Sequence, residues 1–142
     1  MRPTFYGEAL ILGRNRELWS RLDYAASVGC RNLVLNSNGT LLDRWNNLEE
    51  VLASPLRRFI LSLDGLSAGT FESIRVGARH ERVYAAVEAL LERKARSSQR
   101  YPVIICQFSR MAQNAHEVEA FRALLAGARR RGQGPGHARV DG

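Results

Sequence analysis

Hydrophobic and polar residues follow two alternating patterns along the chain. In the first pattern, apolar side chains recur at helical spacing, as at positions 18, 22, 25 and 26 of the segment 15–28. This pattern predicts helices over 15–28, 43–53, 67–75, 80–95 and 114–128. In the second pattern, short apolar runs without helical period end in polar residues or glycine. These runs predict strands over 3–6, 32–38, 57–65 and 101–108.

Residues at the ends of the helical segments support these predictions. Asn15 stands where an N-cap is expected and Gly29 lies just past the end of the same segment. Ser67 is placed to cap a short helix that reaches Arg75. Asn114, with Glu117 three positions later, is typical of another helix start.

The alternation of strands and helices favours an α/β domain with parallel strands and crossover helices, either layered or barrel-shaped. The predicted strands are nearly continuous apolar runs, which is typical of strands covered on both faces. We expect this domain to span 1–128. The remainder, 129–142, is rich in Arg and Gly without periodicity, and we expect a disordered tail.

Composition narrows the class of protein. The 142 residues are the size of one domain, and 45% of them are hydrophobic. No apolar run approaches the length of a membrane span and no signal peptide is recognisable, so we expect a soluble, cytoplasmic protein. Cys30 and Cys106 are far apart in sequence and sit in apolar stretches, so we expect buried thiols rather than a metal site made by this chain alone.

The chain is basic, with a formal net charge of +7, and all but one of its 21 Lys and Arg residues are Arg. Four of these arginines lie in 129–142, while the others are scattered among Glu residues without a basic run that includes aromatics. Nucleic-acid binding is therefore not favoured as the main function, although a basic nucleic-acid binder remains an alternative.

Polar side chains follow each predicted strand, at the end where parallel α/β sheets bind ligands. They are Gly7 and Glu8, then Asn36 to Thr40, then Ser62, Asp64 and Gly65, and finally Gln107, Ser109 and Arg110. This rim suits a small molecule that bears amino, carboxylate and hydroxyl groups. "SNG" and "DG" are also ordinary turn sequences, and none of the three histidines is assigned a catalytic role.

Four segments in this order, "GEAL", "VLNSNGTLLD", "ILSLDGLSAGTFESIRVG" and "VIICQFSRMAQNAHEVEAF", resemble the radical S-adenosylmethionine (radical SAM) enzymes. The likeness is to those with a SPASM-type extension, and it spans residues 3 to about 126. It implies a partial (β/α)6 TIM-like barrel. It also implies a 4Fe–4S cluster that reductively cleaves S-adenosylmethionine, giving a 5′-deoxyadenosyl radical that abstracts hydrogen from a peptide or small-molecule substrate.

The resemblance also implies which residues bind S-adenosylmethionine. Glu8, after Gly7, faces the methionine amino group, and Ser62 with Arg75 holds the methionine carboxylate. The complete set that it implies is Gly7, Glu8, Asn36, Asn38, Ser62, Arg75 and Gln107.

The family's CxxxCxxC loop, which binds the cluster, has no counterpart in this sequence. We therefore expect a fragment of the fold, truncated at both ends and without catalytic or metal-binding residues, that performs no radical chemistry by itself. A noncatalytic module that binds a peptide or a protein is the main alternative.

Overall fold

A computed structural model describes residues 7–130 and 136–141 of the chain. Its strands are β1 (Val34–Ser37), β2 (Arg58–Ser62), β3 (Val103–Ser109) and β4 (Gly136–Asp141). Its helices are η1 (Ala9–Asn15), α1 (Glu17–Ser27), α2 (Asn47–Ala53), α3 (Ala68–Ile74), α4 (His80–Arg96), η2 (Ala115–Glu117) and α5 (Val118–Arg130). The predicted strand over 3–6 lies outside the described residues.

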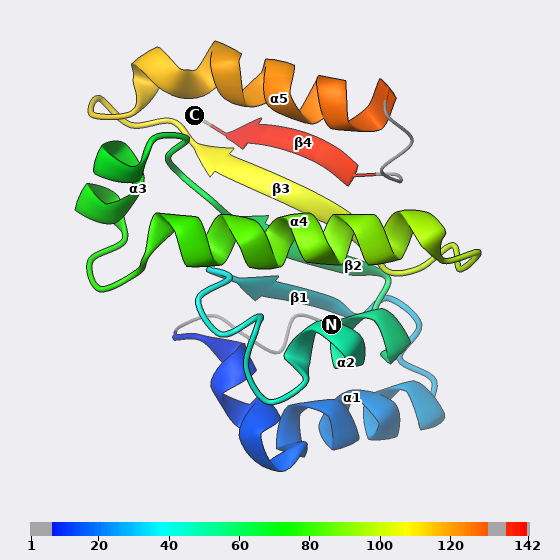
Figure 1. Cartoon of the computed structure of the whole chain (residues 1–142). Helices are drawn as coiled ribbons and strands as arrows, with labels where there is room; N and C mark the ends of the chain where they lie inside the picture. The colour runs from blue at the N-terminus through cyan, green and yellow to red at the C-terminus, as the bar shows by residue number, and fades with distance from the viewer. Residues whose placement is uncertain (1–6, 131–135, 142) are drawn as a thin grey trace.

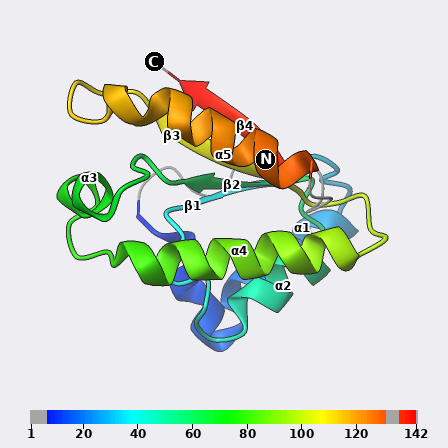
Figure 2. The same cartoon turned by 45° about the horizontal axis from the view of Figure 1, so that its top comes forward.

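The four strands form one parallel sheet in the order β1-β2-β3-β4 (Figure 1). Each strand therefore lies beside the next one along the chain, and the helices between them are crossover connections. Connections of this kind have one handedness, so a sheet in chain order carries its helices on a single face. Figures 1 and 2 show α4 and α5 on the same side of the sheet.

A single hydrophobic cluster joins the helices to that face. The strand residues in the cluster alternate along each strand, because successive side chains point to opposite faces. They are Leu35, Phe59, Leu61, Ile104, Cys106 and Phe108. Each helix with buried apolar residues adds to the same cluster, including Trp19 from α1, Phe71 from α3, Leu90 from α4 and Phe121 from α5. This cluster is the main source of stability, at about 25 cal/mol per Å² of apolar surface buried.

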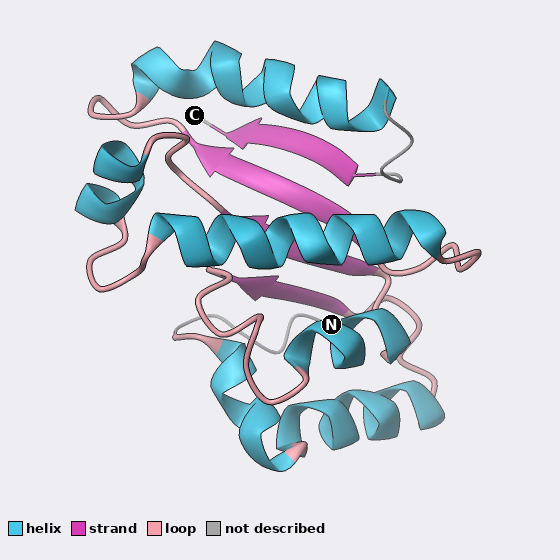
Figure 3. Ribbon diagram, viewed as in Figure 1, coloured by secondary structure: helices cyan, strands magenta, loops and turns pink. Residues whose placement is uncertain are grey.

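The opposite face of the sheet differs from the sequence prediction. We expected helices to cover both faces of the sheet. In the part of the chain that the structure describes, the helices pack on one face only (Figure 3). The other face carries polar side chains at Asn36, Ser62 and Gln107, beside Ile60 and Ile105. These polar positions are few and lie near the strand ends, so they hardly interrupt the apolar runs from which cover on both faces was predicted.

Most predicted elements are confirmed, and α3 begins as expected, with the Ser67 side chain accepting a hydrogen bond from the Thr70 amide. The start of α1 was wrong. Residues 9–15 form the 3-10 helix η1, and Arg16, with a left-handed φ of 58°, takes the N-cap place predicted for Asn15. Sequence patterns do not predict a left-handed φ at an arginine, because this conformation is uncommon for residues other than glycine, asparagine, aspartate and histidine.

The tail predicted for 129–142 contains a helix end and a strand where the structure describes it, while 131–135 and 142 lie outside the described residues. The helix α5 continues to Arg130, past the boundary predicted after residue 128, and β4 pairs in parallel with β3 from Ile104↔Gly136 to Ser109↔Asp141. A free strand edge offers backbone donors and acceptors to any segment that can reach it, whatever the composition of that segment. Across the described residues, no helix is long and apolar enough to cross a membrane.

Candidate functional site

The Glu8 carboxylate fastens the loop that follows β1. Its Oε1 accepts hydrogen bonds from the Ser37 hydroxyl (2.9 Å) and the Leu10 amide (3.1 Å). Its Oε2 accepts one from the Asn38 amide (2.8 Å). Glu8 is also the N-cap of η1, so one half-buried carboxylate connects the first described helix to the carboxyl end of β1. A carboxylate accepts about four hydrogen bonds, which leaves room for one more donor.

The loop itself is a tight turn held by its own side chains. Asn38 Oδ1 accepts hydrogen bonds from the Thr40 amide (2.9 Å) and the Thr40 hydroxyl (2.6 Å). The Ser37 hydroxyl accepts one from the Gly39 amide (2.9 Å). Gly7, just before Glu8, has a φ of +80°, which a glycine adopts at little cost. The predicted binding elements Gly7–Glu8 and Asn36–Asn38 therefore meet at one place.

Three predicted site residues share the face of the sheet opposite the helices. Ser62 and Gln107 are direct partners across β2 and β3. Asn36 is the partner of Ile60, which lies two residues before Ser62 and so points to the same face. All three side chains are half-buried.

The side-chain oxygen of Asn36 lacks a hydrogen-bond donor on this face. Its Oδ1 is buried and has no hydrogen-bond partner in the part of the chain that the structure describes. A buried acceptor without a donor costs about 1–3 kcal/mol. A ligand that brings a hydrogen-bond donor to this face would recover that cost.

A second carboxylate, Asp64, ties together the ends of β2 and β3. It is 4% exposed and has a left-handed φ of 37°. Its Oδ1 accepts a hydrogen bond from the Ser109 amide (2.7 Å), and its Oδ2 pairs with Arg75 Nη2. Asn114 Nδ2 donates to the carbonyl oxygens of Asp64 and Ser109, both at 2.9 Å. Arg75, predicted to hold a ligand carboxylate, thus has a carboxylate partner within the chain.

A third carboxylate, Glu117, fixes the loop before α3. It accepts hydrogen bonds from the Leu66 amide (2.6 Å), the Ser67 amide (3.2 Å) and the Ser67 hydroxyl. Burial raises the pKa of the Glu117 carboxyl. These hydrogen bonds together lower the pKa by more than burial raises it, so the pKa lies below its ordinary value. The sequence correctly marked a helix start here, yet the Glu117 side chain serves a distant loop rather than its own helix.

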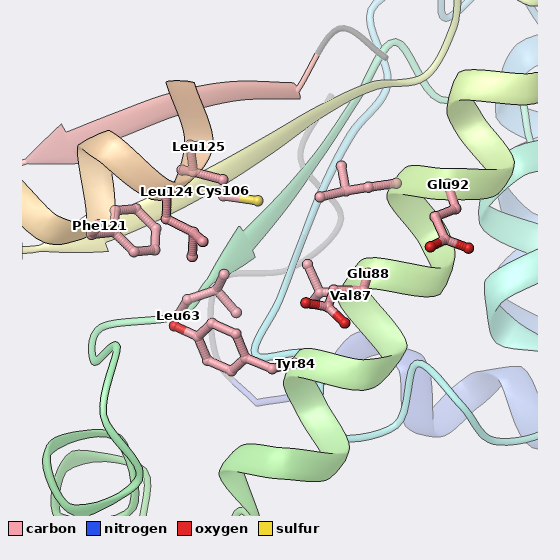
Figure 4. Close-up of a pocket in the computed structure, with 10 residues that line it drawn as sticks. Leu63, Tyr84, Val87, Glu88, Glu92, Cys106, Phe121, Leu124 and Leu125 are labelled. Carbon is pink, nitrogen blue, oxygen red and sulfur yellow. The ribbon is translucent and has the colours of Figure 1, made fainter. Parts of the chain in front are cut away.

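The gap between α4 and α5 holds a pocket of about 200 Å³ on the helix-covered side of the sheet (Figure 4). Its floor includes Leu63 and Cys106, and Tyr84 donates a hydrogen bond to the Gly65 carbonyl (2.6 Å). Burial raises the pKa of the Cys106 thiol to about 12, so this thiol is a poor nucleophile. None of the predicted site residues lines this pocket.

The two cysteines do not form a donor set for an iron–sulfur cluster. Cys106 points into the hydrophobic cluster, and Cys30 precedes β1 at the opposite end of the sheet from Glu8 and Asn38. Within the described residues, no group of three His, Cys, Asp or Glu side chains is placed to hold a metal ion. The residues present therefore do not fit a 4Fe–4S cluster, which requires cysteine thiolates.

Two residues that organise the site, Asp64 and Glu117, are absent from the predicted binding set, although Asp64 was listed among the polar residues after the third predicted strand. Asp64 was read as a turn residue of "DG" and Glu117 as part of a helix start. A Cβ at Gly65 would lie 2.6 Å from Phe71 Cα, so the glycine after Asp64 is required by close packing. In the sequence, the available signal for Asp64 was its position at a strand end, directly before a glycine.

Comparison with known proteins leaves the chain without an assigned relative: no family model, curated protein or solved structure matches it.

Proposed function

We propose that this chain is the S-adenosylmethionine-binding part of a radical SAM fold, a partial (β/α)6 barrel of which β1 to β4 are consecutive strands. Two features support the fold. The parallel strands follow chain order, and the described helices pack on one face, as in a sector of a (β/α) barrel. The face opposite the described helices then corresponds to the inside of the barrel.

The observation that carries the ligand proposal is the convergence of Asn36, Ser62 and Gln107 on that face, with Asn36 Oδ1 buried and unpartnered among the described residues. S-adenosylmethionine offers an ammonium group, ribose hydroxyls and an adenine amine as hydrogen-bond donors. It also offers a carboxylate, which the Ser62 hydroxyl is able to bind as a donor.

Glu8 adds negative charge at the carboxyl end of β1, one residue or two beyond Asn36. Three of its bonds are made within the chain, and the remaining capacity suits the ligand ammonium. Arg75 adds positive charge, although its Nη2 is committed to Asp64. We therefore propose that Arg75 acts mainly by holding Asp64 and the loop after β2.

In the family, an iron–sulfur cluster supplies the electron that cleaves the bound ligand. Because the cysteines of this chain do not fit such a cluster, the activity that we propose for the chain by itself is binding, without turnover.

The test is isothermal titration calorimetry of the whole chain with S-adenosylhomocysteine, a stable analogue of the ligand. We expect saturable binding at one site. Ser62→Ala and Gln107→Ala should each weaken it by about threefold to tenfold, because each removes a hydrogen bond worth about 0.5–1.5 kcal/mol.

Two variants make the same chemical changes elsewhere. Ser20→Ala lies on the exposed side of α1, and Gln113→Ala lies in the exposed loop after β3. Both should bind like the unmodified chain. If the chain gives no heat of binding, or if the controls weaken binding as much as the site variants, the proposal is wrong and a peptide-binding module becomes the better explanation.

A further inference from the structure

Arginines that are distant in the sequence meet at the amino-terminal edge of the sheet, the edge opposite Glu8 and Asp64. Arg31 precedes β1, Arg57 and Arg58 stand at the start of β2, and Arg100 precedes β3. The register Val34↔Arg58↔Val103 aligns the starts of these three strands. Parallel pairing therefore gathers four guanidinium groups that the sequence shows as scattered.

These four arginines have no carboxylate partners in the part of the chain that the structure describes. The ion pairs there engage other arginines: Arg16, Arg21, Arg75, Arg79, Arg82, Arg93, Arg96 and Arg122. Arg31, Arg58 and Arg100 are also exposed. Clustered like charges repel one another, so the fold retains an unfavourable arrangement that an anionic ligand would relieve.

Tyr101 gives this cluster an aromatic centre. The Arg57 guanidinium lies 4.0 Å from the Tyr101 ring centroid, and the Arg100 guanidinium lies 5.3 Å from it. Arg57 Nε also donates to the Arg31 carbonyl (3.2 Å), which fixes the side chain. Stacking uses the flat face of a guanidinium and leaves the other donors at its rim available for phosphate oxygens.

The surface is hollowed around these residues. One pocket of about 460 Å³ is lined by Arg31, Arg57, Arg58, Arg100 and Tyr101, with Asn32 and Val103. A second, of about 240 Å³, shares Arg31, Arg57 and Tyr101 with the first and extends toward Pro55. Neither lining includes an acidic residue.

We propose that this edge, defined by Arg31, Arg57, Arg58, Arg100 and Tyr101, binds single-stranded nucleic acid. Several unpaired arginines along connected hollows suit the successive phosphates of one strand. The guanidinium planes of the exposed Arg31, Arg58 and Arg100, beside the half-buried Tyr101, suit unstacked bases, which a duplex keeps inside its own stack. The site is independent of S-adenosylmethionine binding, because it lies at the other end of the sheet.

The test is fluorescence anisotropy of a labelled 12-residue oligouridylate with the full chain, across a series of salt concentrations. We expect Arg58→Gln combined with Arg100→Gln to weaken binding by about tenfold at low salt. Each lost phosphate contact should reduce the slope of log K against log salt by about 0.7, so the pair should reduce it by about 1.4.

The matched control is Arg14→Gln combined with Arg110→Gln, which removes the same charge from exposed positions outside this edge. It should leave affinity and salt slope near those of the unmodified chain. Tyr101→Leu keeps all the arginines and should weaken binding with an unchanged salt slope, since stacking contributes without releasing ions.

Three results would overturn the proposal: no binding at low salt, equal losses in the control pair, or equal affinity for a polyglutamate peptide of the same charge. The last would show a surface that attracts any polyanion. Equal urea midpoints for all variants exclude unfolding as the cause of any loss.

Discussion

Charged side chains have different environments at the carboxyl and amino edges of the sheet. At the carboxyl edge, Glu8, Asp64 and Glu117 are buried or half-buried, and each accepts hydrogen bonds from backbone amides. At the amino edge, Arg31, Arg58 and Arg100 are exposed and have no carboxylate partner among the described residues. The first edge uses its charges to hold loops in place, while the second leaves its charges available.

This difference separates structural charge from binding charge. A carboxylate that accepts several amide hydrogen bonds contributes to stability, and its removal exposes unsatisfied donors. An exposed arginine without a partner contributes little to stability. Substitutions at the carboxyl edge should therefore be costly to the fold, and substitutions at the amino edge should affect binding alone.

The largest expected effect is that of Asp64→Asn. This variant keeps an acceptor for the Ser109 amide but leaves Arg75, which is 29% exposed, without its counter-charge. We expect a loss of about 2–3 kcal/mol in the free energy of unfolding, measured by urea denaturation, because breaking a buried ion pair strands the remaining charge.

Two controls place this effect in context. Asp43→Asn breaks an exposed ion pair with Arg82, at 2.6 Å, and should cost less than about 1 kcal/mol. Arg58→Gln, at the amino edge, should change stability by less than about 0.5 kcal/mol. A cost for Asp64→Asn no greater than that for Asp43→Asn would contradict the structural role given to Asp64.

A smaller effect is expected for Glu117→Gln, about 1–2 kcal/mol at pH 7, because hydrogen bonds to the charged carboxylate become neutral ones. The folded pKa of Glu117 is depressed, so its contribution to stability is complete above the ordinary pKa of 4.5 and declines as the pH falls through the lower folded pKa. His116 Nε2 lies 3.8 Å from Glu117 Oε1, but its side chain is exposed and should contribute little.

Urea midpoints measured from pH 7 to pH 2 would show this dependence. The difference between the unmodified chain and Glu117→Gln should shrink in the acidic part of the range. The control Glu119→Gln, an exposed residue paired with Arg122, should differ from the unmodified chain by less than about 0.5 kcal/mol at any pH. A difference that persists unchanged to the lowest pH would rule out the proposed charge effect.

The regular elements could be predicted from the sequence because local signals mark them. The helix α4 has a strong amphipathic period, β2 and β3 are apolar runs, and Ser67 caps α3 as expected. Alternation along parallel strands also places Asn36, Ser62 and Gln107 on one face once the register is known. The register depends on long-range pairing, so sequence patterns indicate the strand ends but not their partners.

Other features depend on contacts between distant segments. Asp64 becomes central only when β3 and the loop at Asn114 are beside it, 45 to 50 residues away in sequence. The arginine edge is invisible as a sequence run, since its members come from three separate strand starts. The strand β4 was missed because its partner is the backbone of β3, which side-chain composition does not reveal.

The most direct test of the central claim is an NMR titration of the ¹⁵N-labelled chain, first with S-adenosylhomocysteine and then with the oligouridylate. We predict that the first ligand shifts amide signals around Gly7–Glu8, Asn36–Asn38, Ser62 and Gln107, and that the second shifts signals around Arg31, Arg57–Arg58 and Arg100–Tyr101. If the first ligand shifts no signals, or shifts only those of the pocket between α4 and α5, the assignment of ligand binding to the polar face of the sheet is contradicted.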